Sequence, residues 1–559
     1  MTKKNILVFS LFFILLIVGL SSYKKFGLSI DEPAVRMKAA ETALFVVGKF
    51  SKIFNINIAP VKYKTEEVEK YIDLNFDFNV WPKNATAFYG GVSFSLPVFI
   101  IERLFLDYYP KKNIWFLWHL MNFLFFYVSV IFFYLLTTKF FRNWKIGLMA
   151  SLMLVLSPRI FFESFYNSKD IIFMSAFIIA TYSLLNISKK IDLKNIIFHG
   201  FTTGFLIDLR IVGIIILLPT FILILKNYLN KKICFKNFLN ILLVYILSCI
   251  FTIFLFWPEL WTDIKVFILT FKNLSKFSCG ESLFMGKFYD NCNLPWSYLF
   301  IWISFTTPII FLLLFILGFI LTVIHQNSFW YNFFINRKKF ITNQKLHELA
   351  FLFFLITPVI AAIILNSTLY DGWRHLYFIY PFIIIFATKG LMQLNKITCK
   401  IINKKILLTI LFGLFLQILH WNIVNFPYGN VYFNSLAGKN LSKKFELDYW
   451  GLANREALEF IVKNDNNEKI LVVQDSHSFL TVSLQMLNYE DSKRITILDL
   501  NDLDFEQKLK ELKTNYKSVY RINNFKLVKN FYNETDYNNY HLYYNIISGN
   551  EKILTIYKR

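Results

Sequence analysis

Two adjacent carboxylates, Asp31 and Glu32, follow the first hydrophobic segment of the chain in the stretch GLSIDEP. Ionisable side chains at a membrane are costly and usually mark a function or a paired structure. An ionised Asp can act as a general base toward a hydroxyl group. Because neighbouring side chains on an extended strand point to opposite faces, the two carboxylates are not expected to flank one bond as a glycosidase pair does. We therefore expect Asp31 to be the catalytic base and Glu32 to hold its loop.

Further ionisable residues gather on the same predicted side of the membrane. They are Arg159, Glu163, Lys169 and Asp170 in SPRIFFESFYNSKD, Asp208 and Arg210 in LIDLRIVG, and Asp371, Arg374 and His375 in LYDGWRHLYF. Some have purely structural explanations: Asp208 and Arg210 can neutralise each other, and Lys169 can extend toward the headgroups. Asp170 can be a carboxylate favoured at the start of a helix.

Carboxylates and cations together at an outer membrane surface suit the transfer of a sugar from a lipid phosphate. The leaving group of that reaction is an anion anchored in the bilayer, and Arg or Lys side chains near the headgroups can stabilise its charge. An Asp in an adjoining loop can take the proton of the acceptor hydroxyl. The cations can supply the electrostatic stabilisation, so a divalent metal is possible but not required.

The composition places this chemistry on a polytopic membrane protein. The 559 residues are 56% hydrophobic and 19% aromatic, with a formal charge of +23 and a mean hydropathy of +0.46. A soluble fold could not bury so much apolar surface. Because Lys and Arg are expected in cytoplasmic loops and beside anionic lipids, the positive charge does not indicate nucleic-acid binding.

Hydropathy predicts about eleven membrane-spanning helices. They lie near residues 5–22, 114–138, 144–158, 170–187, 195–209, 210–226, 237–256, 298–323, 348–366, 374–394 and 405–423. If the run 91–107 does not span, five loops on one side hold 18 Lys and Arg residues, against 6 in three short loops on the other. The positive-inside rule then places the N-terminus in the cytoplasm and the tail outside.

This topology divides the chain into a transmembrane domain, residues 1–423, and an extracytoplasmic domain, residues 424–559. Residues 23–113 form a large first external loop, in which 33–54 is predicted to be an interfacial helix. In the tail, KILVVQD, RITILDL and KSVYRIN are predicted strands and NREALEFIVKN a predicted helix, which indicates a small α/β domain.

The five cysteines do not indicate a metal site, because no Cys or His spacing matches a ligand set. Cys234, Cys249 and Cys399 lie in or beside hydrophobic segments. Cys279 and Cys292 share one predicted external loop, where a disulfide can form or both thiols can stay free.

An ordered series of short motifs resembles the type C glycosyltransferases, particularly family 39, which includes protein O-mannosyltransferases and the lipid A aminoarabinose transferase. The motifs are SIDEP, FYGGVSF, WHLMNFLFF, SPRIFFESFYNSKD, LRIVG, FWPELW, TLYDGWRHLYFIYP and YGNVYFNSLAG, and they cover residues 1 to about 460. The resemblance implies a bacterial inner-membrane enzyme with a polyprenyl-phosphate sugar donor and a hydroxyl acceptor on a lipid, glycan or protein.

The resemblance also implies roles for single residues. The first-loop Asp of the family corresponds to Asp31, and the second external-loop Asp to Asp170. Family members hold the lipid phosphate with basic residues at the outer ends of the spans, for which Arg210, Arg374 and Lys169 are the candidates. His375 and Tyr89 complete the expected substrate site. The chain has Gly90 and Gly91 after Tyr89 where the aminoarabinose transferase has a Lys, so a lipid A acceptor is not implied.

Two other functions fit parts of the sequence. A transporter or flippase would explain the many spans and charges, but transporters typically show internal repeats and polar groups near mid-membrane. A scaffold protein could use the tail for docking, since the tail has no nucleophile elbow or P-loop. Neither function explains why the ionisable residues gather at one surface.

Overall fold

The computed structural model describes residues 3–54, 91–106, 111–274, 279–336, 342–398, 403–474, 480–499, 507–508, 511–512, 516–524 and 540–559. Nine helices in these ranges are long and apolar enough to cross a membrane: Lys4–Lys25, Lys111–Phe141, Asp170–Lys189, Ile211–Leu229, Phe235–Phe256, Ile309–Asn327, Asn343–Ile364, Arg374–Leu394 and Lys405–Val424. Each coincides with a predicted span. The chain is a multi-pass membrane protein.

Three of the predicted spans and the run 91–107 differ in detail from the prediction. The segments 144–158 and 195–209 correspond to the shorter helices α5 (Trp144–Leu156) and α8 (Leu193–Leu209). The segment 298–323 is broken into α12 (Tyr298–Thr306) and α13 (Ile309–Asn336), because Pro308 at the break has no N–H to continue a helix. The run 91–107 contains α3 (Ser95–Phe105), whose 11 residues extend only about 16 Å. This length is too short to cross the bilayer, as predicted.

The described residues form two compact units. The first comprises residues 1–31, 106–174 and 278–559. It contains α1 (Lys3–Ser22), α4 (Lys111–Phe141), α5, α6 (Pro158–Glu163), the start of α7 (Asp170–Lys189), β1 (Glu281–Phe284), β2 (Lys287–Asp290), α12, α13, α14 (Asn343–Ile364), α15 (Tyr380–Thr398), α16 (Lys404–Val424) and the tail. Helices α13 and α15 pack closely in this unit, since a Cβ added at Gly318 would lie 1.9 Å from the Phe386 carbonyl oxygen.

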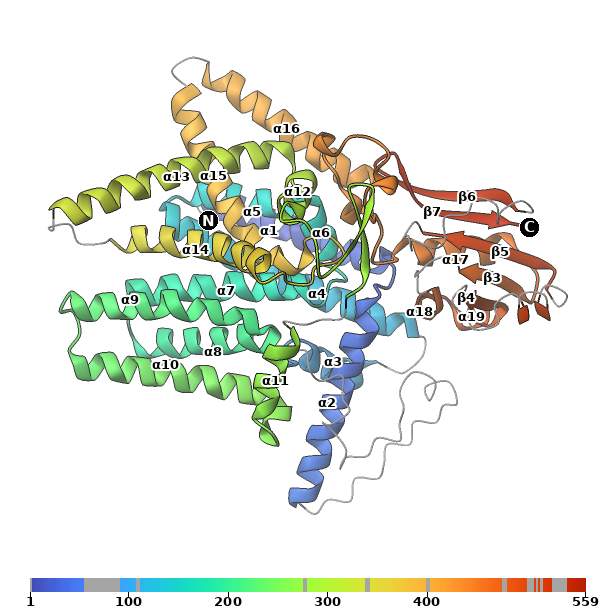
Figure 1. Cartoon of the computed structure of the whole chain (residues 1–559), viewed down its shortest axis with the longest axis horizontal. Coiled ribbons are helices and arrows are strands. Elements are labelled where there is room, and N and C mark those ends of the chain that lie inside the picture. Colours follow the sequence, from blue (N-terminus) through green and yellow to red (C-terminus); the bar gives the residue numbers. More distant parts are fainter. Residues whose placement is uncertain are drawn as a thin grey trace. The chain divides into compact units, whose positions relative to one another are not determined.

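The tail forms the predicted small α/β domain (Figure 1). Its sheet has the order β4-β3-β5-β7-β6, with strands Ile495–Asp499, Ile470–Gln474, Ser518–Asn523, Glu551–Lys558 and His541–Ser548. Strands β4, β3 and β5 are parallel, whereas β7 and β6 are antiparallel additions. The helices are α17 (Ala453–Asn464), α18 (Leu480–Ser483) and α19 (Tyr489–Arg494). Strands β3, β4 and β5 match the three predicted strands within one residue.

The second unit comprises residues 32–105 and 175–277. It contains α2 (Asp31–Phe54) beyond its first residue, α3, most of α7, α8, a 3₁₀ segment (Ile211–Ile216), α9 (Leu217–Leu229), α10 (Phe235–Phe256) and α11 (Lys265–Leu274). Figure 1 shows α8, α9 and α10 side by side in green. Helices α8 and α10 approach each other closely at two glycines. A Cβ added at Gly200 would clash with the backbone oxygen of Tyr245, and one added at Gly204 with that of Cys249.

Candidate active site

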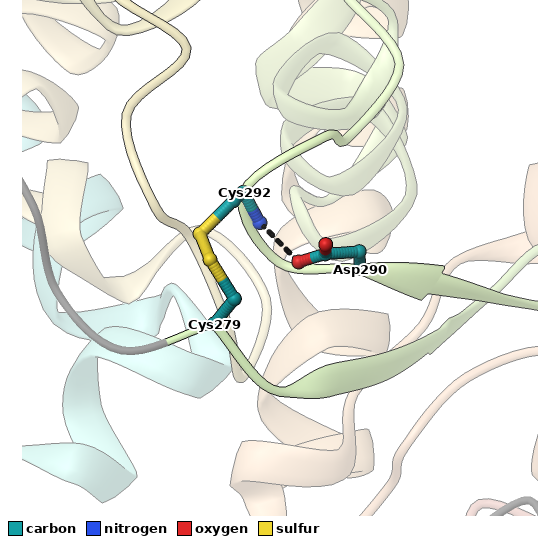
Figure 2. Close-up of side chains that lie close together, drawn as sticks. All are labelled: Cys279, Asp290 and Cys292. Atoms are coloured by element: carbon teal, nitrogen blue, oxygen red, sulfur yellow. Dashed lines mark hydrogen bonds between the residues drawn. A yellow bond between two sulfur atoms is a disulfide. The ribbon is translucent and has the colours of Figure 1, made fainter.

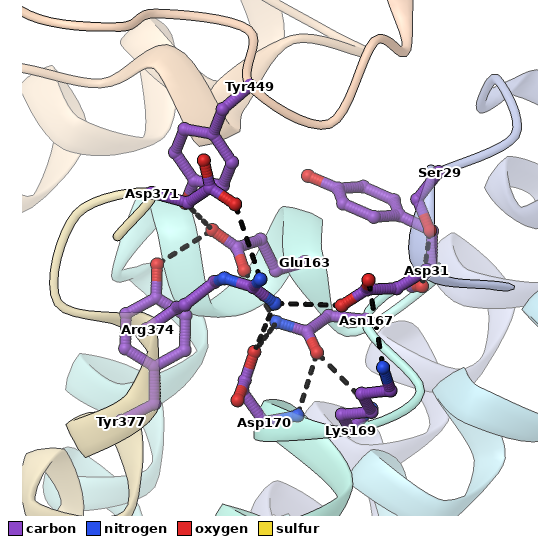
Figure 3. Close-up of polar contacts among 11 residues, drawn as sticks. Ser29, Asp31, Glu163, Asn167, Lys169, Asp170, Asp371, Arg374, Tyr377 and Tyr449 are labelled. Atoms are coloured by element: carbon purple, nitrogen blue, oxygen red, sulfur yellow. Dashed lines mark hydrogen bonds and ion pairs between the residues drawn. The ribbon is translucent and has the colours of Figure 1, made fainter. Parts of the chain in front are cut away.

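Arg374 lies at the centre of three aspartates in the first unit (Figure 3). Its Nη1 donates to Asp31 Oδ2 at 2.8 Å and to Asp170 Oδ2 at 3.2 Å. Its Nη2 donates to Asp371 Oδ2 at 3.2 Å. The guanidinium is buried, with 3% of the side chain exposed, so these bonds form in a low dielectric and are strong. The structure thus brings together three of the predicted residues, Asp31, Asp170 and Arg374, and adds Asp371.

A tight turn aims Asp371 at Arg374. Asp371 has a φ of 54° and Gly372 a φ of 77°, so two successive residues adopt the left-handed conformation. Gly tolerates this conformation freely, and Asp is among the few other residues that do. The turn is followed by the 3₁₀ segment that starts at Arg374, and the side chains three residues apart meet.

Two aromatic rings hold the Arg374 guanidinium from the sides. Its Cζ lies 4.9 Å from the ring centroid of Tyr370 and 4.7 Å from that of Trp450. Such cation–π contacts suit an Arg better than a Lys, since the guanidinium is planar. Trp450 comes from the tail, and its carbonyl also accepts a hydrogen bond from Ile30 N at 3.3 Å. The tail residue therefore contacts both the central cation and the segment that carries Asp31.

Asp31 is the most accessible of the three aspartates. Its side chain is 22% exposed, whereas those of Asp170 and Asp371 are buried. Lys169 Nζ lies 3.7 Å from Asp31 Oδ1. Burial by itself raises the pKa of Asp31, but the charges of Lys169 and Arg374 outweigh burial and hold this pKa well below its usual range. Asp31 is thus ionised at neutral pH, as a general base must be.

Asn167 fixes the residues that start α7. Its Oδ1 accepts hydrogen bonds from the backbone N–H groups of Asp170 at 2.7 Å and Lys169 at 3.3 Å. Its Nδ2 donates to Asp170 Oδ2 at 3.2 Å and to Glu163 Oε2 at 2.8 Å. An Asn in this position satisfies N–H groups that the first helical turn leaves without partners. The side-chain amide of Asn167 therefore fixes the backbone positions of both Lys169 and Asp170.

Glu163 forms a second, fully buried layer beneath the aspartates. Its Oε1 accepts hydrogen bonds from Tyr377 Oη at 2.7 Å and from Tyr449 Oη at 3.1 Å. Burial raises the pKa of Glu163, although the hydrogen bonds from Tyr377 and Asn167 oppose the rise. This layer links α6, the 3₁₀ segment that starts at Arg374, and the tail, and so supports the aspartate cluster.

The remaining predicted site residues have other placements. Glu32 is fully buried and, with Asp31, opens helix α2 instead of an extended loop. The extended-chain reason for separating their roles is therefore wrong, although consecutive helical residues also point in different directions. His375 is half-buried, with its ring centroid 4.7 Å from that of Tyr370, and its charge helps to lower the pKa of Asp31.

Two predicted residues are not among the described residues of this unit. Tyr89 lies outside the described residues, and Arg210 belongs to the second unit, where it caps the C-terminal end of α8. Their roles stay predictions. In the second unit, Asp208 Oδ2 accepts a hydrogen bond from Ser93 N at 2.9 Å.

Sequence reasoning assigned no role to several members of the network. Asp371 and Glu163 were noted as ionisable, whereas Asn167, Tyr449 and Trp450 were not singled out. Asn167 had a readable signal, since an Asn three residues before an Asp at a helix start resembles a capping motif. The tail aromatics had none, because their contacts are made with residues far away in the chain.

The two cysteines of the predicted external loop are joined, as Figure 2 shows. Cys279 and Cys292 form a disulfide that closes the β1–β2 hairpin. Asp290 lies beside them and accepts a hydrogen bond from Cys292 N at 2.9 Å. These three residues are close enough to hold a metal ion, but the disulfide leaves no thiolate to act as a ligand. The cluster is structural.

Comparisons with known proteins give a distant likeness. No family model matches the sequence, and no curated protein is similar to it. Among solved structures, ArnT from Cupriavidus metallidurans in the apo state is similar, with a TM-score of 0.46 and 10% identity over 99% of this chain and 97% of that chain. A second structure of the same protein, bound to undecaprenyl phosphate, has a TM-score of 0.42 and 10% identity over 99% and 98%. The function is therefore inferred from the site itself.

Proposed function

We propose that the protein is an integral membrane glycosyltransferase. It transfers a sugar from a polyprenyl-phosphate donor to a hydroxyl group of a lipid, glycan or protein on the extracytoplasmic face of a bacterial inner membrane. The observation that carries this proposal is Asp31: an ionised, partly exposed carboxylate directly after the first span, held by two cations. In the proposed topology the N-terminus is cytoplasmic and the tail extracytoplasmic.

The reaction is a single displacement that inverts the anomeric carbon. The acceptor oxygen attacks this carbon, the bond to the phosphate oxygen breaks, and the electron pair leaves with the phosphate. Asp31 takes the acceptor proton. Because its pKa is lowered, Asp31 is a weak base, and proton transfer must be late, when the attacking oxygen has already become acidic through bond formation.

We propose a role for Arg374 that differs from the predicted one. It was expected to bind the lipid phosphate, but three carboxylates already engage its guanidinium. A phosphate would add more negative charge to a cluster that is acidic. Arg374 is therefore a positioning residue that holds Asp31 ionised and aimed. The same cation stands between carboxylates that could otherwise ligate a metal, so the proposed reaction needs no divalent ion.

The test is transfer of radiolabelled sugar from a panel of polyprenyl-phosphate sugars in membranes. Wild type is compared with Asp31→Asn, which keeps the shape but cannot accept the proton, and with Glu490→Gln, an exposed carboxylate in α19. We expect transfer by wild type and Glu490→Gln, and a loss of about 10²–10⁴-fold in Asp31→Asn. Full transfer by folded Asp31→Asn would remove the base. Absence of transfer with every donor, together with uptake of the labelled lipid across the membrane, would favour a flippase.

A further inference from the structure

Arg159 is a buried arginine whose hydrogen-bonding capacity is largely unused. Only 2% of it is exposed, and its Nε donates to the Tyr432 carbonyl at 3.3 Å. Within the described part of the chain, neither Nη1 nor Nη2 has a hydrogen-bond partner, and no carboxylate forms an ion pair with it. A buried charge with unpaired donors is strongly unfavourable, so this arrangement requires an explanation.

Other arginines of the protein show how such a group is usually satisfied. Arg374 has three aspartates. Arg36 forms two bonds to Glu102, and Arg455 bonds to Glu459 and to two backbone carbonyls. Arg494 donates to three backbone carbonyls. Arg159, in contrast, donates through Nε to one backbone carbonyl, and its two Nη nitrogens donate to none of the described groups.

The surroundings of Arg159 hold its guanidinium in place without neutralising it. The Cζ atom lies 5.3 Å from the ring centroid of Trp302 and 5.0 Å from that of Phe433. Trp302 is itself nearly inaccessible. Aromatic faces attract the cation but accept no in-plane hydrogen bonds, so the donors of both Nη groups remain unused in a preformed, planar fork that is buried in this structure. This geometry matches two oxygens of a phosphate group.

Arg159 also belongs to the region of the active site. It precedes Glu163 by one helical turn of α6, and its charge lowers the pKa of Glu163 against the effect of burial. Glu163 in turn bonds Tyr377, Tyr449 and Asn167, and Asn167 fixes Asp170. A hydrogen-bond network therefore runs from Glu163, on which the charge of Arg159 acts, to the aspartate cluster around Arg374.

We infer that Arg159, supported by Trp302 and Phe433, binds the phosphate group of the lipid-linked donor and of the product, an inference that rests on the proposed function. When the bond between the anomeric carbon and the phosphate oxygen breaks, a phosphodiester with one negative charge becomes a monoester with nearly two. The guanidinium fork stabilises this added charge, and Asp31 takes the acceptor proton. Arg159 thus does what Arg374, neutralised by its aspartates, cannot do.

The experiment measures binding of polyprenyl phosphate, polyprenol and inorganic phosphate to the purified full-length protein in detergent. Arg159→Gln is compared with wild type and with Arg103→Gln, which changes an exposed arginine of α3. We expect Arg159→Gln to weaken polyprenyl-phosphate binding about 10- to 100-fold, the value of the lost charge-assisted bonds. Arg103→Gln should bind as wild type does, and polyprenol should bind weakly to all three proteins. If Arg159→Gln does not fold, Arg159→Lys keeps the charge but loses the fork, and should bind several-fold more weakly than wild type.

The outcomes separate this inference from the proposed function. Equal polyprenyl-phosphate affinity in wild type and a folded Arg159 variant would overturn the role of Arg159 and leave the transferase intact. Binding of inorganic phosphate that depends on Arg159, without binding of polyprenyl phosphate, would support an anion site but contradict the lipid-linked donor. Competition between inorganic phosphate and polyprenyl phosphate in wild type, lost in Arg159→Gln, would support both.

Discussion

Replacing Arg374 by Gln should move the acidic limb of the pH–activity profile to higher pH. The Asp31 carboxylate accepts from Arg374 at 2.8 Å in a buried site, whereas Lys169 is 3.7 Å away and 42% exposed. Removing the guanidinium leaves burial, which raises the pKa of Asp31, opposed mainly by a screened lysine. An Arg partner at this distance lowers an Asp pKa by about 1–3 units. We therefore expect the limb to shift by that amount, equivalent to about 1.4–4 kcal/mol.

The loss of Arg374 should move the acidic limb to higher pH, because it removes a charge that favours the ionised form of Asp31. In the wild type the base stays ionised at pH values well below the usual carboxyl range, so transfer should fall only in strong acid. In Arg374→Gln protonation of Asp31 starts at higher pH, and transfer should fall in mildly acidic buffer.

The assay is single-turnover transfer between about pH 3 and 8 in detergent, with Lys169→Gln and Glu490→Gln measured in parallel. Because water screens Lys169, Lys169→Gln should shift the limb by about one unit or less. Coincident acidic limbs in wild type and Arg374→Gln would refute the conclusion that Arg374 sets the ionisation of the base. A larger shift in Lys169→Gln than in Arg374→Gln would refute the ranking of the two cations.

Three further predictions concern the support of the site. Glu163→Gln should lower thermal stability by about 1–3 kcal/mol, since its new amide cannot accept all of the bonds now made to the carboxylate; an unchanged melting temperature would contradict this. Transfer should persist in EDTA, because Arg374 supplies the charge between the aspartates; a loss restored by Mg²⁺ or Mn²⁺ would show otherwise. The double variant Cys279→Ser, Cys292→Ser should lower the free energy of unfolding by about 3 kcal/mol, the value for a disulfide that closes a loop of this length. Mild reduction of the wild type should lower its melting temperature as much as the double substitution does.

The sequence was sufficient to predict the elements of the fold, because hydropathy and strand alternation are local properties. The predicted bounds of strands β3, β4 and β5 and of helix α17 agree with the structure within one residue. The break at Pro308 was missed because the flanking runs are equally apolar, although the proline is a recognised signal. The predicted interfacial helix 33–54 starts two residues after the true start of α2 at Asp31.

The site was only partly predictable. Asp31, Lys169, Asp170 and Arg374 were found because ionisable residues beside apolar segments are conspicuous. Their contacts with one another were not predicted, and we propose a positioning role for Arg374 in place of the predicted contact with the phosphate. Trp450 carried no signal, because its contact with Arg374 depends on how the tail folds back onto the helices. Pairing of this kind is a property of the assembled chain.

The distance in sequence between Asp31 and Arg374 sets an order of events during synthesis. The two residues are separated by 343 positions, so at about 5–20 residues per second the cation emerges about 17–70 s after the carboxylate. Trp450, which contacts the same cation, follows later still. Throughout that interval the nascent protein carries Asp31 without Arg374, and it has no assembled aspartate cluster. On the proposed mechanism, transfer requires the segments that carry Arg374 and Trp450, so a chain released before they have been made is expected to be inert.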